Sequence, residues 1–290
     1  MIVNPFFSII IPTYARPRSL AACLRALAGL HYPRARFEVV VVDDGSETPP
    51  RDVIASFEDA LDLTLLVQRH AGPAAARNHG AAQARGPFLA FTDDDCAPAP
   101  GWLEALAAHL VAAPDHLVGG QTRNALAGNP YATASQLLID YLYAAPQQTR
   151  FFAANNMALS AAQFHAVGGF DPTFARAAGE DREFCDRWQH NGYPMAYVPA
   201  AVVYHAHALT GRTFWRQHFN YGRGALRFHR ARARRRQSRL RIEPISFYLG
   251  LLRYPFSQMG GWRALRLTAL LAVSQAANAA GFFWGNVQAR

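Results

Sequence analysis

The 290-residue sequence contains no lysine, because all 29 of its lysine-or-arginine positions are arginine. This absence excludes a phosphate-binding loop that ends in Gly-Lys, a Schiff-base lysine and a lysine general base. Cysteine is also scarce: the three cysteines lie far apart and form no Cys-x-x-Cys pair. That number and spacing exclude a disulfide scaffold and a zinc ribbon, and they fit a reducing compartment.

Charge is low as well, at 17% of the chain against about 25% in an average soluble protein. This deficit predicts that part of the surface is covered by a membrane or a partner. Hydrophobic residues make up 51%, which excludes wholesale disorder, and the length fits one or two domains. The N-terminus has no basic segment followed by a cleavable small-residue site, so we expect no signal peptide.

Short apolar runs alternate with helical patterns in the first half of the chain. The runs cover residues 6–11, 39–42, 61–67 and 87–91. Leucine or alanine at helical spacing occupies the segments between and after them, at 20–27, 74–84 and 103–110. This alternation predicts an α/β fold with a doubly wound, mostly parallel sheet flanked by helices. Ligands bind at the carboxyl ends of such strands, so the residues that follow the runs are candidates for a site.

Three acidic residues, Asp93, Asp94 and Asp95, follow the run that ends at residue 91. Carboxylates one residue apart can hold Mg²⁺ or Mn²⁺ together with the phosphates of a substrate. The alternative is a solvated acidic loop. The place of the triplet at the predicted ligand edge favours the metal site.

Two further segments are ambiguous when each is taken alone. Asp43 and Asp44 follow the valine run, where a carboxylate can bind a base or a ribose, or can belong to a turn and helix cap. Arg77 and Asn78 lie in a predicted helix, where arginine can clamp a phosphate or base or can lie on the surface.

In this order, the segments resemble the family 2 glycosyltransferases of the GT-A fold. The resemblance rests on Ser8–Tyr14 with Arg16, Val41–Ser46, Gly72–Asn78, Phe91–Asp95 with Pro100–Leu103, Asn156–Ala158, Gly168–Asp171, Gly179–Asp181 and His205. Each motif is weak alone, but the ordered set is specific and spans residues 6 to 210. It implies an inverting enzyme that transfers a sugar from a nucleotide-diphosphate sugar to a hydroxyl acceptor, with Mn²⁺ or Mg²⁺ as cofactor.

The resemblance also implies roles for individual residues. It assigns the nucleotide-sugar donor to Pro12, Thr13, Tyr14, Arg16, Asp43, Asp44, Arg77, Asn78, Asp93 and Asp94. It assigns the metal to Asp93, Asp95 and His205, with Asp95 favoured as a direct ligand and His207 as a competitor of His205. Cys96 stands where family members often have aspartate, which leaves the metal shell open.

The catalytic base of the family corresponds to the pair Glu180 and Asp181. We expect Asp181 to accept the proton of the attacking hydroxyl, with Glu180 and Glu183 as nearby alternatives. The ordinary alternative is that these acidic residues only begin a helix, where they stabilise its first turn.

The composition changes at residue 212. Residues 212–241 contain 11 arginines and no acidic residue, and the apolar segments 245–256 and 267–287 follow. We therefore predict a catalytic domain at 1–211 and a basic, apolar helical extension at 212–290. The extension fits attachment to an anionic membrane surface, a helix pair in a homo-oligomer, or core helices that back the catalytic domain.

The family resemblance, together with the basic and apolar extension, implies a glycan or glycolipid acceptor in cell-envelope synthesis, in the cytoplasm at the inner face of the membrane. Two rival functions remain. One is nucleic-acid binding through the arginine cluster at 212–241, which no nucleic-acid motif accompanies. The other is nucleotidyl transfer on a similar fold. Residues 117–150 show no pattern from which the acceptor can be predicted.

Overall fold

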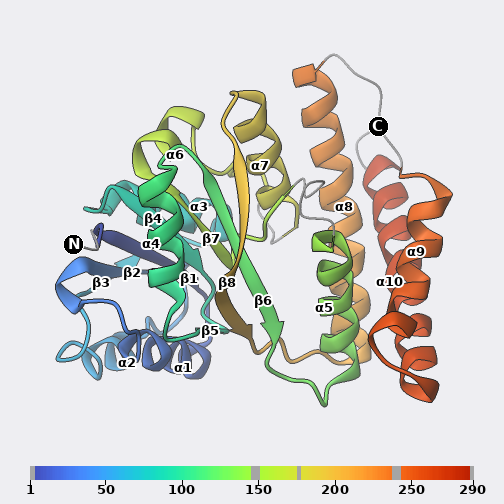
Figure 1. Ribbon diagram of the computed structural model, residues 1–290, viewed down its shortest axis with the longest axis horizontal. Helices are drawn as coiled ribbons and strands as arrows, with labels where there is room; N and C mark the ends of the chain where they lie inside the picture. Colours follow the sequence, from blue (N-terminus) through green and yellow to red (C-terminus); the bar gives the residue numbers. More distant parts are fainter. Residues whose placement is uncertain (1–3, 145–150, 175–177, 237–242, 288–290) are drawn as a thin grey trace. The chain divides into compact units, whose positions relative to one another are not determined.

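The computed structural model describes residues 4–144, 151–174, 178–236 and 243–287 (Figure 1). Its strands are β1 (Phe7–Thr13), β2 (Phe37–Asp43), β3 (Leu63–Val67), β4 (Phe88–Thr92), β5 (Cys96–Pro98), β6 (Leu117–Asn124), β7 (Asn156–Ser160) and β8 (Met195–His205). Its α-helices are α1 (Pro17–Ala28), α2 (Arg51–Ala55), α3 (Pro73–Gln83), α4 (Trp102–Ala112), α5 (Pro130–Tyr143), α6 (Ala161–Val167), α7 (Glu180–His190), α8 (Gly211–Arg236), α9 (Ile245–Gln258) and α10 (Gly261–Val287), and a 3₁₀ turn (η1) covers Arg34–Arg36.

The chain divides into two compact units, which we call the sheet unit and the helical unit. The sheet unit comprises residues 1–123 and 151–206, and the helical unit comprises 124–150 and 207–290. Residues 124–150 therefore group with the C-terminal helices and not with the rest of the predicted catalytic domain. The assignment of a catalytic domain to 1–211 and an extension to 212–290 stays a prediction.

One mixed sheet forms the centre of the sheet unit, with the strand order β3-β2-β1-β4-β7-β6-β8-β5. Strands β3, β2, β1 and β4 are parallel, as the apolar runs predict, and every residue of β1 and β2 is buried. Helices on both faces account for that continuous burial. The other half is antiparallel, with β7 paired to β4 and β6, and β5 paired to β8. The α/β fold and the C-terminal helices that the sequence predicts are confirmed.

The sheet register positions the polar residues. Thr13 at the end of β1 lies opposite Asp43 at the end of β2, and β4 ends at Thr92 on the same edge, because the three strands are parallel. The antiparallel pair of β5 and β8 places His205 opposite Cys96. Two segments more than a hundred residues apart therefore meet just beyond β4.

The helical unit contains α5, α8, α9 and α10. Its core includes small and large apolar side chains, namely Ala134, Leu137, Leu209, Phe214 and Leu267. Two glycines bring α8 and α10 into close contact: a Cβ atom on Gly222 would lie 1.9 Å from the carbonyl oxygen of Asn278, and one on Gly281 would lie 1.9 Å from that of Phe219. Backbone therefore packs directly against backbone where these helices cross.

Candidate active site

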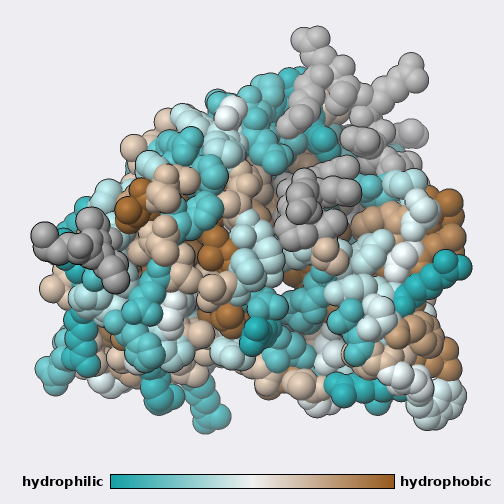
Figure 2. Space-filling view, in the orientation of Figure 1, coloured by the Kyte–Doolittle hydropathy of each residue, from teal (hydrophilic) through white to brown (hydrophobic). Residues whose placement is uncertain are grey.

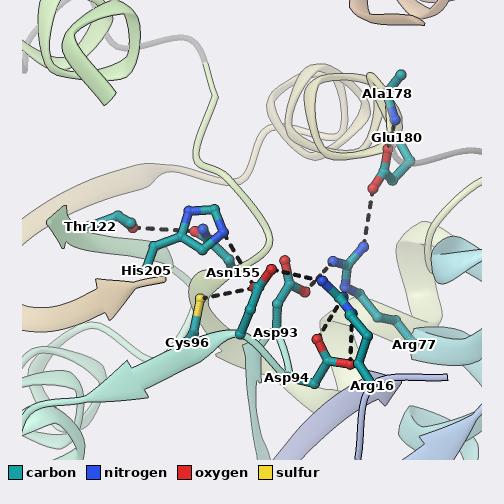
Figure 3. A network of polar contacts seen from close by, with 11 residues as sticks. Arg16, Arg77, Asp93, Asp94, Cys96, Thr122, Asn155, Ala178, Glu180 and His205 are labelled. Atoms are coloured by element: carbon teal, nitrogen blue, oxygen red, sulfur yellow. Dashed lines mark hydrogen bonds and ion pairs between the residues drawn. The ribbon is translucent and has the colours of Figure 1, made fainter. Parts of the chain in front are cut away.

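The three acidic side chains after β4 have different partners (Figure 3). Asp93 forms an ion pair with Arg77, with Nη2 and Oδ1 2.6 Å apart. Asp94 is fully buried and accepts a hydrogen bond of 2.7 Å from the Thr13 hydroxyl. Arg16 binds Asp94 through Nη2 at 2.6 Å and Asp95 through Nη1 at 2.8 Å. The triplet is therefore an ion-pair network and not a solvated loop.

Asp94 anchors Arg16 within this network. Burial raises the pKa of Asp94 to about 7, against the opposing effects of the Arg16 charge and the Thr13 hydrogen bond. One carboxylate oxygen binds Thr13 and the Nε of Arg16, and the other binds the Nη2 of Arg16. Both oxygens are committed to protein groups, so Asp94 fits a role in positioning Arg16 better than a role as a metal ligand.

His205 and Asp95 form a second pair at this edge. The Nε2 of His205 lies 3.3 Å from Oδ1 of Asp95, and both side chains are mostly buried. Burial lowers the pKa of His205, but the hydrogen bond to Asp95 and the charges of Asp95 and Asp93 outweigh it, so the net shift is upward. The pairing of β8 with β5 is what brings His205 here.

The donor atoms of Asp95, Cys96 and His205 lie within 4.8 Å of one another. A carboxylate and an imidazole are suitable ligands for Mn²⁺, and the phosphates of a substrate can complete the shell. Cys96 differs from the other two, since it belongs to the hydrophobic core and burial raises the pKa of its thiol. Asp95 and His205 therefore fit a divalent cation, whereas Cys96 fits as packing behind them.

Asp44 ties the end of β2 to the start of α3. Its carboxylate accepts hydrogen bonds of 2.9 Å from the backbone nitrogens of Ala71 and Gly72, and one of 2.8 Å from the side chain of Gln68. Gly72 has a φ of 92°, a left-handed conformation that favours glycine at this turn. Contact of Asp44 with a base stays a prediction, and in the structure Asp44 has the loop-anchoring role that turn chemistry predicts.

The neighbouring Asp43 is fully buried and accepts hydrogen bonds from the backbone and the hydroxyl of Ser46. The ring of Tyr14 packs against that of His70 with centroids 4.5 Å apart, and both side chains are about half exposed. Sequence reasoning missed His70 and Gln68, because neither belongs to a recognisable motif. Pro12 lies within β1 opposite Val42.

Arg77 is buried, so the alternative interpretation as a surface arginine is wrong. Its Nη1 lies 3.1 Å from Oε1 of Glu180, and its Nη2 binds Asp93. Asn78 exchanges two hydrogen bonds with the backbone of Phe170, of 2.7 and 2.8 Å, and so fixes the turn before it. Direct contact of Arg77 or Asn78 with a donor stays a prediction.

The acidic pair begins α7, directly after Gly179, whose φ is 92°. Glu180 is buried, and its second oxygen accepts a hydrogen bond of 2.9 Å from the backbone nitrogen of Ala178. Asp181 is half-buried and accepts one from the backbone of Arg182. Burial raises the pKa of both carboxyl groups; Arg77 partly opposes the rise at Glu180, and Arg182 followed by Arg77 opposes it at Asp181. Both groups are shifted toward the pH at which a general base works best.

Two family models match this chain and identify its family. The model of Glycosyl transferase family 2 matches residues 8–171, more than half of the chain, and that of Glycosyl transferase family group 2 matches residues 91–285. The chain belongs to the family 2 glycosyltransferases. The matched ranges include all the acidic residues of the site up to Asp181, and the second range also includes His205.

Curated relatives of this family 2 glycosyltransferase include two bacterial enzymes. The chain is 34% identical over 223 residues to validoxylamine A glucosyltransferase of Streptomyces hygroscopicus, covering 66% of this chain and 53% of the relative. It is 31% identical over 229 residues to pre-mycofactocin glycosyltransferase of Mycobacterium tuberculosis, covering 75% of this chain and 46% of the relative. The chain thus spans about half the length of these relatives.

Solved structures show the same fold. A mannosyltransferase from Pyrobaculum calidifontis, solved in complex with GDP-Man and Mn²⁺, matches with a TM-score of 0.63 at 22% identity and covers 99% of this chain and 81% of its own. Residues 1–349 of Staphylococcus aureus TarS, solved in complex with UDP-GlcNAc, match with a TM-score of 0.61 at 18% identity, covering 96% and 89%. The GT-A fold implied by the family resemblance is confirmed.

Proposed function

We propose that this glycosyltransferase moves a sugar from a nucleotide-diphosphate sugar to a hydroxyl acceptor with inversion at the anomeric carbon, in the synthesis of an envelope glycan or glycolipid. The observation that carries the proposal is the network in which Arg77 joins the acidic triplet to the acidic pair at the start of α7. Inverting transfer needs a cation site beside a diphosphate and a separate general base, and the network links candidates for both.

Asp181 is the base that the geometry favours. Both oxygens of Glu180 already bind Arg77 and the Ala178 backbone, and Glu183 forms an ion pair of 2.7 Å with Arg187. Asp181 takes the proton of the acceptor hydroxyl as that oxygen attacks the anomeric carbon. A bond forms between the acceptor oxygen and the anomeric carbon, the bond from the anomeric carbon to the diphosphate oxygen breaks, and nucleoside diphosphate departs.

On the donor side, Asp95 and His205 would hold Mn²⁺ or Mg²⁺, with Asp93 beside them. The cation, when bound, neutralises the negative charge that develops on the leaving diphosphate. Arg16, which is half exposed and held by Asp94 and Asp95, stands next to this position, where its positive charge favours the phosphates. Tyr14, which follows β1, and His70, which follows β3, are exposed with their rings in tilted contact, and they are suited to contact a nucleoside base.

A donor panel tests the proposal. UDP-glucose, UDP-N-acetylglucosamine and GDP-mannose are each incubated with the protein in Mn²⁺, in Mg²⁺ and in a chelator, and nucleoside diphosphate release is measured. Water serves as the acceptor until a glycan is identified. We expect release from at least one donor that stops in the chelator. Release of inorganic diphosphate instead would indicate nucleotidyl transfer and contradict the proposal.

Three substitutions then test the base. We expect Asp181→Asn to lower turnover by about 10²–10⁴-fold with little change in nucleoside diphosphate affinity, because an amide cannot accept the proton. Glu183→Gln is the matched control, since its carboxylate is already paired with Arg187. If Asp181→Asn retains turnover while Glu180→Gln or Glu183→Gln loses it, the base is the other residue.

We also propose that the helical unit attaches the enzyme to an anionic membrane surface at the cytoplasmic face. Among the residues that the structure describes, α10 is the one helix long and apolar enough to cross a membrane. Its exposed side chains include Trp262, Phe283 and Trp284, and the neighbouring α9 exposes Phe256. In Figure 2, hydrophobic residues cluster on the surface at the position that α9 occupies in Figure 1. Exposed aromatic side chains beside arginines favour an anionic lipid interface.

Vesicle co-sedimentation tests this attachment. We expect the full chain to bind vesicles of phosphatidylglycerol and not those of phosphatidylcholine, and the variant with Trp262→Ser and Trp284→Ser to bind less. The control is Val111→Ser, which removes an exposed apolar side chain from the sheet unit. A concentration-dependent dimer that masks the tryptophans, with no vesicle binding, would favour the homo-oligomer instead. Neither family model describes a nucleic-acid-binding protein or a nucleotidyltransferase, so those alternatives lack support.

A further inference from the structure

Arg77 connects the two acidic motifs of the site. Its side chain is 4% exposed, and its two terminal nitrogens bind two carboxylates, that of Asp93 after β4 and that of Glu180 at the start of α7 (Figure 3). The two partners are 87 positions apart in the sequence, and α3 holds the arginine between them. The guanidinium also lies 5.7 Å from the ring centre of Phe170, which restricts its movement further.

The contacts of Glu180 extend this connection to Asp181. Oε1 of Glu180 binds Arg77, and Oε2 accepts a hydrogen bond from the backbone of Ala178, two residues before the helix begins. The carboxylate therefore ties the start of α7 both to Arg77 and to the segment that precedes the helix. Asp181 lies on that turn, so its carboxylate is positioned by the ion pair without touching Arg77 through a hydrogen bond of its own.

The electrostatic interactions of Arg77 support the same connection between the two acidic motifs. Asp93, Glu180 and Asp181 all act electrostatically on Arg77, the one basic residue among the described groups that pairs with two of them. Without this arginine, the three carboxylates would repel one another across the site, and the two ion pairs that join Asp93 to Glu180 through Arg77 would be lost. An arginine can satisfy two carboxylates at once because its guanidinium presents several donors in a fixed plane.

We propose that Arg77 is a positioning residue, which holds the base motif of α7 at a fixed distance from the acidic triplet so that Asp181 faces the sugar that the triplet side binds. The inference rests on the proposed function, since the distance between the motifs matters only if one side binds the donor and the other activates the acceptor. A misplacement of 1 Å between reacting groups can cost about 10²-fold in rate.

The test compares turnover with affinity. Turnover is the release of nucleoside diphosphate from the donor that the panel identifies, and affinity is the Kd for UDP or GDP in Mn²⁺. For Arg77→Gln we expect turnover to fall by about 10²-fold while the Kd changes less than about 3-fold. For Arg77→Lys we expect a turnover between that of the parent and that of Arg77→Gln, because one ammonium group can replace one ion pair and not both.

Arg85 provides a matched control. It also bridges two carboxylates, those of Glu38 and Asp62, but near the beginning of β2 and β4 and not at their carboxyl ends. We expect Arg85→Gln to leave turnover unchanged. If Arg77→Gln does not fold, Arg77→Lys and the double variant of Arg77→Gln with Glu180→Gln, in which a carboxylate is removed together with the arginine, carry the test. The double variant should lose less than the product of the two single losses.

Two results would overturn the inference. If the Kd for nucleoside diphosphate rises as much as turnover falls, Arg77 binds the phosphates directly. If the Arg77 and Arg85 variants behave alike, or if turnover falls only in proportion to the folded fraction, Arg77 has a structural role alone. Absence of turnover in the parent enzyme with every donor would instead refute the proposed function, which keeps the two failures distinct.

Discussion

The crossing of α8 and α10 gives a sharp prediction for one added methyl group. In Gly281→Ala, the new Cβ would lie 1.9 Å from the carbonyl oxygen of Phe219 and 2.8 Å from its carbonyl carbon. Both are backbone atoms, so no side-chain rotation relieves the overlap. The two helices must separate by roughly 1 Å or more, because protein interiors are packed to van der Waals contact.

Two effects oppose each other in this variant. Alanine is favoured over glycine within a helix by about 1 kcal/mol. Overpacking that displaces backbone costs about 1–3 kcal/mol or more, and the separation also loosens the contacts along the rest of a 27-residue helix. We expect a net loss of about 2 kcal/mol in the free energy of unfolding, which lowers Tm by about 3 °C if the 290-residue chain unfolds as one cooperative unit.

Thermal unfolding followed by circular dichroism measures the effect. Gly260→Ala is the control, because no atom lies within 4 Å of its Cβ position, and we expect its Tm to stay close to that of the parent. Gly222→Ala should resemble Gly281→Ala, since its Cβ would meet the carbonyl oxygen of Asn278 at 1.9 Å. One separation relieves both overlaps, so the double variant should lose less than the sum. A rise in Tm for Gly281→Ala would refute the close crossing.

Three other perturbations have expected outcomes. Burial, aided by the charge of His207, lowers the pKa of His218 to about 4, below its value of about 6.5 in an unfolded chain. The unfolded chain therefore binds the proton first, and about 3 kcal/mol of stability is lost as pH falls from 6.5 to 4, a loss that His218→Gln should remove. Mn²⁺ at 100 times its Kd should stabilise the parent by about 2.7 kcal/mol in thermal melts, and Asp95→Asn, but not the exposed Asp52→Asn, should abolish that gain. Asn129→Ala should cost about 1 kcal/mol in urea unfolding, because the Asn129 side chain caps α5 through the backbone nitrogens of Tyr131 and Ala132.

Local patterns were sufficient to predict the parallel half of the fold. The apolar runs around Ile10, Val41 and Phe91 became β1, β2 and β4, and the polar residues after them meet at one edge, as parallel strands require. The antiparallel half was not predicted. Strand β5 has three residues, and β6 includes Gly119 and Gly120, so neither shows the alternation or the long apolar run typical of a strand. One usable signal was missed, since Asn129 followed by proline is a helix start.

The roles of site residues depend on contacts that no local pattern contains. An alanine-rich helix does not reveal which of its faces is covered, so Arg77 could not be recognised as buried, and its partner Glu180 lies 103 positions away. His205 reaches Asp95 only because β8 pairs with the three-residue β5. Motif order predicted which residues form the candidate site. The contacts between these residues could be determined only from the folded structure.

The charge of the site itself leads to a last prediction, on how donor and metal bind. Five carboxylates, those of Asp93, Asp94, Asp95, Glu180 and Asp181, lie near three arginines (Arg16, Arg77 and Arg182), and burial raises the pKa of three of the carboxyl groups. A nucleoside diphosphate adds further negative charge and is repelled by the carboxylates. A divalent cation between Asp95 and His205 is attracted both by the carboxylates and by the diphosphate. We therefore expect Mn²⁺ to strengthen UDP or GDP binding by at least about tenfold, and the nucleotide to strengthen Mn²⁺ binding by the same factor, because such coupling is reciprocal. Calorimetric titration of each ligand with and without the other measures both factors. Independent binding would mean that the cation and the diphosphate do not share this edge of the sheet.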